Sequence, residues 1–359
     1  MSHLFEPLKL RTVTLRNRIA VSPMCQYSCH QGFATDWHLV HLGSRAVGGA
    51  GLVMVEATAV TPEGRITDQD LGLWSDAHAE PLARIARFVR EQGAVPGIQI
   101  AHAGRKASRK APWLGDRELT VEEGRWQVIG PSALPFSETY ATPEAMSVEQ
   151  IQSTIAAFTK TAERALAAGF QFLEVHAAHG YLLNSFLSPL SNQRQDAYGG
   201  SFDNRCRMLI ETVRAVRKVW PESLPLAVRL SCSDWVEDGW TIEDSITLAQ
   251  ELKKETVDLI DCSSGGLSSQ ARITVGANYQ VPFAEAIRRR AGIATGAVGM
   301  ITQSMQADAI IRNEQADLVL FARELLRDPY WPLRAQKELH AKTEALVPKP
   351  YARAFPGQS

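Results

Sequence analysis

Two imidazoles and a phenol stand within six positions of one another, as His176, His179 and Tyr181. They follow an apolar run, residues 170–173, that predicts a buried strand. Side chains at the end of a strand are well placed for chemistry, because a rigid element holds them while the following loop leaves them accessible. This group of hydrogen-bond donors and acceptors therefore predicts the centre of a functional site.

Size and charge exclude several classes of protein. The chain has 359 residues and a formal net charge of -1, which argues against nucleic acid or an anionic membrane as the main partner. No stretch approaches the ~20 consecutive apolar residues of a membrane span. Residues 1–7 lack the charged and apolar regions of a signal peptide. We therefore expect a cytoplasmic protein that acts on small molecules.

The cysteines predict neither a disulfide framework nor a metal site. Their number is odd and their positions are scattered: Cys25, Cys29, Cys206, Cys232 and Cys262. Cys25 and Cys29 have the spacing of half a metal site, but no second Cys/His pair follows at the usual distance. We expect no bound metal, and small buried thiols at the last three positions.

Eight short apolar runs recur along the chain, with helical patterns between them. The runs cover residues 19–24, 51–57, 96–102, 170–176, 225–231, 258–263, 294–299 and 317–322. Continuous rather than alternating apolar residues are typical of strands covered on both faces. The clearest helix begins after Ser147, with Gln150 completing a capping box, and ends at Gly169. Further helices are predicted over residues 79–92, 242–254 and 303–313.

Strand and helix alternating eight times predict an α/β fold of the (β/α)8, or TIM-barrel, type. A doubly wound sheet is the alternative, but it usually has a glycine-rich turn after its first strand, and residues 22–25 contain no glycine. Residues 8–18 alternate in polarity and predict an N-terminal hairpin that closes one end of the barrel. The long loop between His102 and Ser147 predicts a partly ordered lid. We expect one domain, 1–359, with an aromatic tail, 330–359, that is buried on this barrel or on a neighbour.

In such a barrel the C-terminal ends of the strands form the face where activity resides. The side chains expected there are Ser22, Pro23, Met24, Cys25, Tyr27, Ala57, Thr58, Gln99, His102, His176, His179, Tyr181, Arg229, Gly299 and Arg323. The set lacks paired carboxylates and is rich in neutral hydrogen-bonding groups, with two arginines. It favours a large, planar, anionic cofactor beneath a carbonyl-bearing substrate. A phosphate is expected at the loops after the last two strands.

Four motifs carry a family resemblance. They are Ser-Pro-Met-Cys-Gln-Tyr at residues 22–27, His-Ala-Gly-Arg-Lys at 102–106, His-Ala-Ala-His-Gly-Tyr-Leu at 176–182 and Asp-Ala-Tyr-Gly-Gly-Ser-Phe-Asp-Asn-Arg at 196–205. In this order they resemble the old yellow enzyme family, and within it the YqjM-like and xenobiotic reductase A-like bacterial branch. The resemblance spans essentially the whole chain. It implies an FMN-dependent ene-reductase that oxidises NADPH or NADH and reduces activated C=C bonds of α,β-unsaturated carbonyl compounds, with nitro compounds as further candidates.

The resemblance also assigns roles to residues. Those implied to bind the flavin are Ser22, Pro23, Met24, Cys25, Ala57, Gln99, Arg229, Val298, Gly299, Ala322 and Arg323. Gln99 is expected at the pyrimidine edge, Arg229 near N1 and O2 and Arg323 at the phosphate. Positive charge near N1 favours the reduced ring. Cys25 is expected to modulate the flavin potential and substrate fit and not to act as a nucleophile.

For the substrate, the resemblance implies that His176 and His179 hold the carbonyl. Hydride then passes from flavin N5 to the β-carbon, and Tyr181 gives a proton to the α-carbon. Tyr27 is implied as a further substrate contact. Arg353 matches an arginine that YqjM-like members insert into a partner's site, which implies a homodimer or a dimer of dimers.

Two residues depart from the family pattern. Ala322 stands where the family commonly has glycine, next to the expected phosphate. Val298 stands where xenobiotic reductase A-like members carry tryptophan, which implies a wider pocket.

Other interpretations of these residues remain open. A His-x-x-His pair is also typical of a metal site or a satisfied core pair. Strict strand alternation would place His176 and His179 on opposite faces, so the chain must leave strand geometry for both to reach one ligand. Tyr181 and Cys25 have packing as an alternative role, and Arg229 a structural ion pair.

Three rival functions follow from these alternatives. The dienoyl-CoA reductase type needs clustered cysteines that are absent here. A metal-dependent barrel hydrolase needs more His and Asp ligands at strand ends. A catalytically silent flavin-binding protein would share the same residues. The preference between NADPH and NADH is not predicted.

Overall fold

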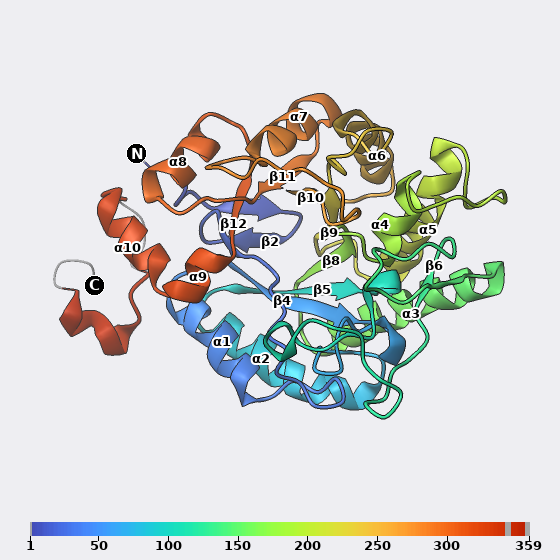
Figure 1. The fold of residues 1–359 in the computed structure, drawn as a ribbon. Coiled ribbons are helices and arrows are strands. Elements are labelled where there is room, and N and C mark those ends of the chain that lie inside the picture. Colours follow the sequence, from blue (N-terminus) through green and yellow to red (C-terminus); the bar gives the residue numbers. More distant parts are fainter. Residues whose placement is uncertain (1, 342–345, 356–359) are drawn as a thin grey trace.

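The computed structural model describes residues 2–341 and 346–355. Its centre is a closed barrel of eight parallel strands (Figure 1). In order around the barrel they are β3 (Ile19–Val21), β4 (Leu52–Ala59), β5 (Val95–Ala101), β8 (Phe172–Ala177), β9 (Leu226–Ser231), β10 (Leu259–Ser263), β11 (Ala294–Ala297) and β12 (Leu318–Phe321), with β12 pairing back onto β3. The predicted (β/α)8 barrel is confirmed, and each of the eight apolar runs overlaps one of these strands.

Helices surround the strands, as Figure 1 shows. They are α1 (Asp36–Val47), α2 (Ala79–Glu91), α3 (Val148–Ala167), α4 (Leu182–Leu187), α5 (Phe202–Val219), α6 (Ile242–Lys254), α7 (Val281–Ala291), α8 (Ser304–Arg312), α9 (Arg323–Arg327) and α10 (Trp331–Glu338). The capping box of α3 is present: Ser147 Oγ accepts from the Gln150 amide, and Gln150 Oε1 accepts from the Ser147 amide at 2.7 Å. The barrel strands are buried along almost their whole length, because the helices cover their outer face and side chains fill the barrel.

A short hairpin closes the N-terminal end of the barrel. Strands β1 (Leu8–Leu10) and β2 (Val13–Leu15) pair antiparallel, and the turn passes through Arg11 with φ +53°. Leucines and a valine of the hairpin join a buried cluster with residues of the barrel strands, among them Met54 and Phe172. The predicted hairpin is confirmed, and it leaves the C-terminal ends of the strands as the open mouth.

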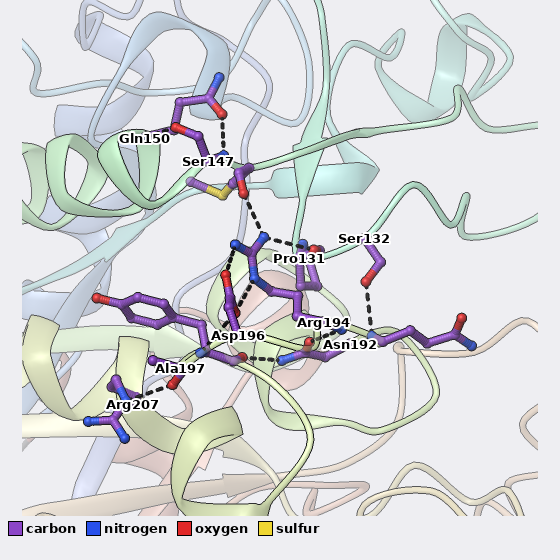
Figure 2. A network of polar contacts seen from close by, with 12 residues as sticks. Pro131, Ser132, Ser147, Gln150, Asn192, Arg194, Asp196, Ala197 and Arg207 are labelled. Atoms are coloured by element: carbon purple, nitrogen blue, oxygen red, sulfur yellow. Dashed lines mark hydrogen bonds and ion pairs between the residues drawn. The ribbon is translucent and has the colours of Figure 1, made fainter.

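The long loop after β5 contains a small sheet of its own. Strands β6 (Ile129–Gly130) and β7 (Glu144–Ala145) pair in parallel. Figure 2 shows how this segment is fastened: Arg194 donates to the carbonyls of Pro131, at 3.1 Å, and Met146, at 2.6 Å, and pairs with Asp196. The stretch 196–205 therefore has a structural role, leading through Ser201, the N-cap, into α5.

The C-terminal segment lies to one side of the barrel (Figure 1). Trp331 of α10 is buried against Phe321 of β12, with ring centroids 4.2 Å apart. A last 3-10 turn, Lys349–Ala354, follows. The parts of the predicted tail at 342–345 and 356–359 lie outside the described residues. Within the described part of the chain, no helix is long and apolar enough to cross a membrane.

Candidate active site

The chain leaves strand geometry directly after β8. This departure is the one expected from the sequence if His176 and His179 are to reach one ligand. Strand β8 ends at Ala177, and His179 adopts a left-handed backbone with φ +61°. This turn brings the His176 and His179 rings to 5.3 Å between centroids, and places Tyr181 5.1 Å from His176 and 6.4 Å from His179. The side chains of His176, His179 and Tyr181 therefore form one cluster at the barrel mouth.

The cluster is electrically neutral. Burial, followed by the Arg229 and Lys106 cations, lowers the pKa of His176 well below its ordinary value, and burial has the same effect on the pKa of His179. The His176 Nδ1 atom accepts from the Ala178 amide at 3.3 Å, which leaves the ring proton on Nε2. Burial raises the pKa of Tyr181 well above its ordinary value. The site thus offers an imidazole N–H and a phenol O–H that retain their protons.

Three residues hold His179 in its strained backbone conformation. Its amide donates to Ser231 Oγ at 2.9 Å, and its Nε2 lies 2.7 Å from Ser263 Oγ. The Lys106 ammonium donates to the carbonyl oxygens of His179, at 3.0 Å, and Gly266, at 2.9 Å. Sequence analysis gave none of these three a role. Ser231 and Ser263 are the last residues of two predicted strands, and this position could have marked them as site residues. Lys106 is the last residue of the motif at 102–106.

The segment after β3 is fastened to the wall of the barrel. Glu56 lies at a register irregularity between Val55 and Ala57 of β4. Its carboxylate accepts from the Gln26 amide at 2.9 Å and pairs with His38 Nε2 at 3.1 Å. Gln26 is the residue held by this contact. It follows directly on Ser22, Pro23, Met24 and Cys25 and precedes Tyr27, which has φ +48°.

Cys25 and Tyr27 are half-buried on either side of Gln26. Burial, followed by Asp70 and Glu56, raises the pKa of the Cys25 thiol well above its ordinary value. A protonated thiol is a poor nucleophile, and the role expected for Cys25 beside the flavin stays a prediction. All five cysteines are free thiols. The Tyr27 ring packs edge-on against Trp113 of the lid, with centroids 5.5 Å apart.

A cavity of about 260 Å³ opens beside the cluster, at the ends of β9, β11 and β12. Arg229, Val298, Gly299, Ala322 and Arg323 all line it, so the structure brings these predicted residues together. Gly299 has φ +124°, and a Cβ atom there would lie 2.9 Å from side-chain atoms of Tyr279 and Gln280. Any side chain at this position would disturb the cavity wall.

Arg323 supplies a positive charge to this cavity. Its described partner is the Met300 sulfur, at 3.4 Å, and no carboxylate among the described residues pairs with it. A thioether is a weak acceptor, so the guanidinium is available for an external anion. A cavity with an unpaired arginine suits a phosphate.

Gln99 and Arg229 each contact a carboxyl group inside the barrel. Gln99 Nε2 donates to Glu174 Oε1 at 2.7 Å, and Arg229 Nε lies 3.1 Å from Asp261 Oδ2. The structural ion pair considered for Arg229 is therefore present, and the residue also lines the cavity. Neither Glu174 nor Asp261 was predicted from the sequence as a site residue, because both lie within strands and not at their ends.

Arg353 is not brought together with the other predicted residues within this chain. It is exposed in the turn Lys349–Ala354, to one side of the barrel (Figure 1). Within residues 2–341 and 346–355, no group of three or more His, Cys, Asp or Glu side chains is arranged to hold a metal ion.

Comparisons with known proteins agree with this geometry. Residues 3–342 match the model of the NADH:flavin oxidoreductase / NADH oxidase family. The chain is 52% identical over 346 residues to an NADPH dehydrogenase of Geobacillus sp. (strain WCH70), covering 96% of each chain. It is 49% identical over 354 residues to the NADPH dehydrogenase of Bacillus subtilis (strain 168), covering 98% of this chain and 99% of that one.

Solved structures share the fold. Morphinone reductase superimposes with a TM-score of 0.79 at 27% identity, over 95% of this chain and 91% of that one. A complex of 2-naphthoyl-CoA reductase with 2-naphthoyl-CoA gives a TM-score of 0.85 at 26% identity, over 96% of this chain. The match covers 53% of that reductase, so this chain corresponds to about half of it.

Proposed function

Because the chain belongs to the NADH:flavin oxidoreductase / NADH oxidase family, the family of the old yellow enzymes, we propose that it is an ene-reductase. As a member of this family it is an FMN-dependent oxidoreductase of the NADPH dehydrogenase type. The proposed substrates are α,β-unsaturated carbonyl compounds, with nitro compounds as further candidates. The observation that carries the proposal is the neutral cluster of His176, His179 and Tyr181 beside an arginine-lined cavity.

The residues of the cavity fit FMN. The Arg323 guanidinium, which has no carboxylate partner among the described residues, would hold the phosphate beside Val298, Gly299 and Ala322. Arg229 would face the N1–O2 edge and Gln99 the pyrimidine edge. Ser22, Pro23, Met24, Cys25 and Ala57 would line the ring. When bound, FMN would supply the hydride for the β-carbon of the alkene, with NADPH as the reductant.

The protein's part in the reaction is orientation and proton supply. The Nε2–H of His176 and a ring N–H of His179 would donate to the substrate carbonyl and draw electron density from the alkene. Both rings stay neutral, so they act as hydrogen-bond donors and not as general acids. The Tyr181 hydroxyl would give its proton to the α-carbon, and the Tyr27 hydroxyl would contact the substrate. Val298 has a smaller side chain than the tryptophan that xenobiotic reductase A-like members carry there, and this difference would widen the pocket.

The test is anaerobic and needs the purified yellow protein. NADPH should bleach the flavin bands, and 2-cyclohexenone should restore them; a flavin that bleaches but is not restored by any enone, maleimide or nitro compound would contradict the ene-reductase proposal. Replacing His176 by Ala should weaken the charge-transfer binding of phenols while flavin content stays intact. Loss of flavin in that variant would mean that the residue serves the cofactor and not the substrate.

A further inference from the structure

Two carboxyl groups are sealed inside the barrel beneath the proposed flavin site, and the mechanism above does not use them. Glu174 of β8 is 1% exposed and Asp261 of β10 is 0% exposed. Glu174 lies two positions after Phe172, a member of the barrel's interior cluster, and therefore points to the same side. Asp261 is the register partner of Arg229, which in turn is the partner of His176. Glu174 thus lies two positions before His176 on the interior side of β8, and Asp261 lies level with His176 in the strand register, two strands away.

These acids have too few partners to remain ionised together. Glu174 accepts one hydrogen bond, from Gln99. Asp261 pairs with Arg229, yet neither of its oxygens has a hydrogen-bond partner among the described residues. One guanidinium facing two buried carboxylates leaves an uncompensated negative charge in a region without solvent, which is strongly unfavourable. One proton retained between the two acids removes that charge.

We propose that Glu174 and Asp261 act as a buried proton-holding pair that sets the charge Arg229 presents to the bound cofactor. With one proton on the pair, Arg229 and the remaining carboxylate form a neutral unit. When negative charge gathers at the N1–O2 edge of the cofactor, the pair holds its proton more tightly, because a like charge nearby disfavours ionisation. The two acids are positioning residues that act through Arg229. The proposal rests on the placement of Arg229 at that edge, and it does not involve an alkene.

The surroundings of the pair contain few other titratable groups. Burial, followed by Asp261, raises the pKa of Glu174 to about 8, against the opposing effects of Arg229 and Gln99. Burial also raises the pKa of Asp261. His176 on β8 is neutral, and Tyr279 faces Arg229 from the loop before α7. The nearby interior residues of β4 and β12, Met54 and Leu320, are apolar.

The measurement is the midpoint potential of the bound flavin in the holoenzyme between pH 6 and 9.5. In the wild type the potential should fall more steeply above a pH of about 8 than below it, by about twofold in slope, because reduction then takes up one additional proton. Glu174→Gln and Asp261→Asn should each remove the steepening, since the remaining carboxylate has no proton to share. The double variant should have a more positive potential at every pH, because Arg229 has lost its counter-charge.

Asp308→Asn is the matched control. Asp308 is also buried, but it lies on α8, where it accepts from Ser2 and the Leu4 amide. This variant should keep the wild-type profile. A wild-type profile with one slope throughout would overturn the proposal without any variant, as would steepening that persists in both single variants. Because no enone is present, failure here is distinct from failure of the proposed ene-reduction.

Discussion

At the scale of single residues, the left-handed turn at His179 decides what the site can bind. A regular strand would turn His176 and His179 to opposite faces, whereas the turn brings both rings to one side. A positive φ at a residue other than glycine is uncommon and needs support from its surroundings. Here that support comes from Lys106, Ser231 and Ser263. The sequence predicted the departure from strand geometry but not what stabilises it.

Tyr181→Phe should separate the two halves of the reaction. Removing the phenol proton should slow reoxidation by 2-cyclohexenone by roughly 10²- to 10⁴-fold, the usual contribution of a positioned acid. Reduction by NADPH should be unaffected, because it requires no proton from the protein. Anaerobic stopped-flow absorbance measures both halves. Equal slowing of the two would assign Tyr181 a packing role.

Glu174 should make stability depend on pH. Its pKa is raised from 4.5 to about 8, so the folded state holds a proton that the unfolded state has released between these values. Stability should therefore decrease as pH rises across this window, by at most about 1.4 kcal/mol per unit. Glu174→Gln should reduce this dependence, and thermal unfolding of both proteins from pH 5 to 9 measures it. A constant difference between the two curves would refute the assignment.

At the scale of elements, the sequence predicted what local patterns encode. Barrel strands and the helices at residues 79–92, 242–254 and 303–313 appear within a few residues of their predicted limits, because periodicity and capping act over one or two turns. The interior of the lid was not predicted. Its strands β6 and β7 are two residues long, and Arg194, which fastens them, is 63 positions from Pro131 and 48 from Met146. Contacts across such separations leave no local signature.

Arg194→Met should loosen the lid without disturbing the barrel. The change removes donors to two carbonyls and the ion pair to Asp196, at a cost of roughly 1–3 kcal/mol for the groups left unpaired. Hydrogen exchange should accelerate in residues 129–146, while β8 and β9 keep their protection. Arg207→Met, which removes a contact to the Ala197 carbonyl on the same network (Figure 2), is the matched control and should leave the lid protected.

At the scale of the whole molecule, the described part of the C-terminal tail presents exposed side chains to solvent. Arg353 is exposed, and Tyr351 is 44% exposed beside Tyr330. We propose that the tail completes the site of a second copy in a homodimer or a dimer of dimers. Neither the sequence nor one chain contains the surface that would receive it, so this placement could be inferred only from the family resemblance.

Arg353→Ala should test that proposal. If Arg353 reaches a neighbour, the variant should bind phenols less tightly while the flavin potential stays unchanged. Mixed dimers of Arg353→Ala and Tyr181→Phe chains should recover activity in one of their two sites. Sedimentation velocity establishes the assembly state in parallel. A monomeric wild type with full activity would exclude the arrangement.

The hairpin β1–β2 fills the lower end of the barrel with leucine and valine side chains. Among the described residues the hairpin therefore closes this end of the barrel, and on the proposed function NADPH and the electron acceptor would enter at the opposite end, above the imidazoles, and occupy it in alternation. Steady-state rates should accordingly give parallel lines in double-reciprocal plots, and a high concentration of either reactant should inhibit competitively against the other.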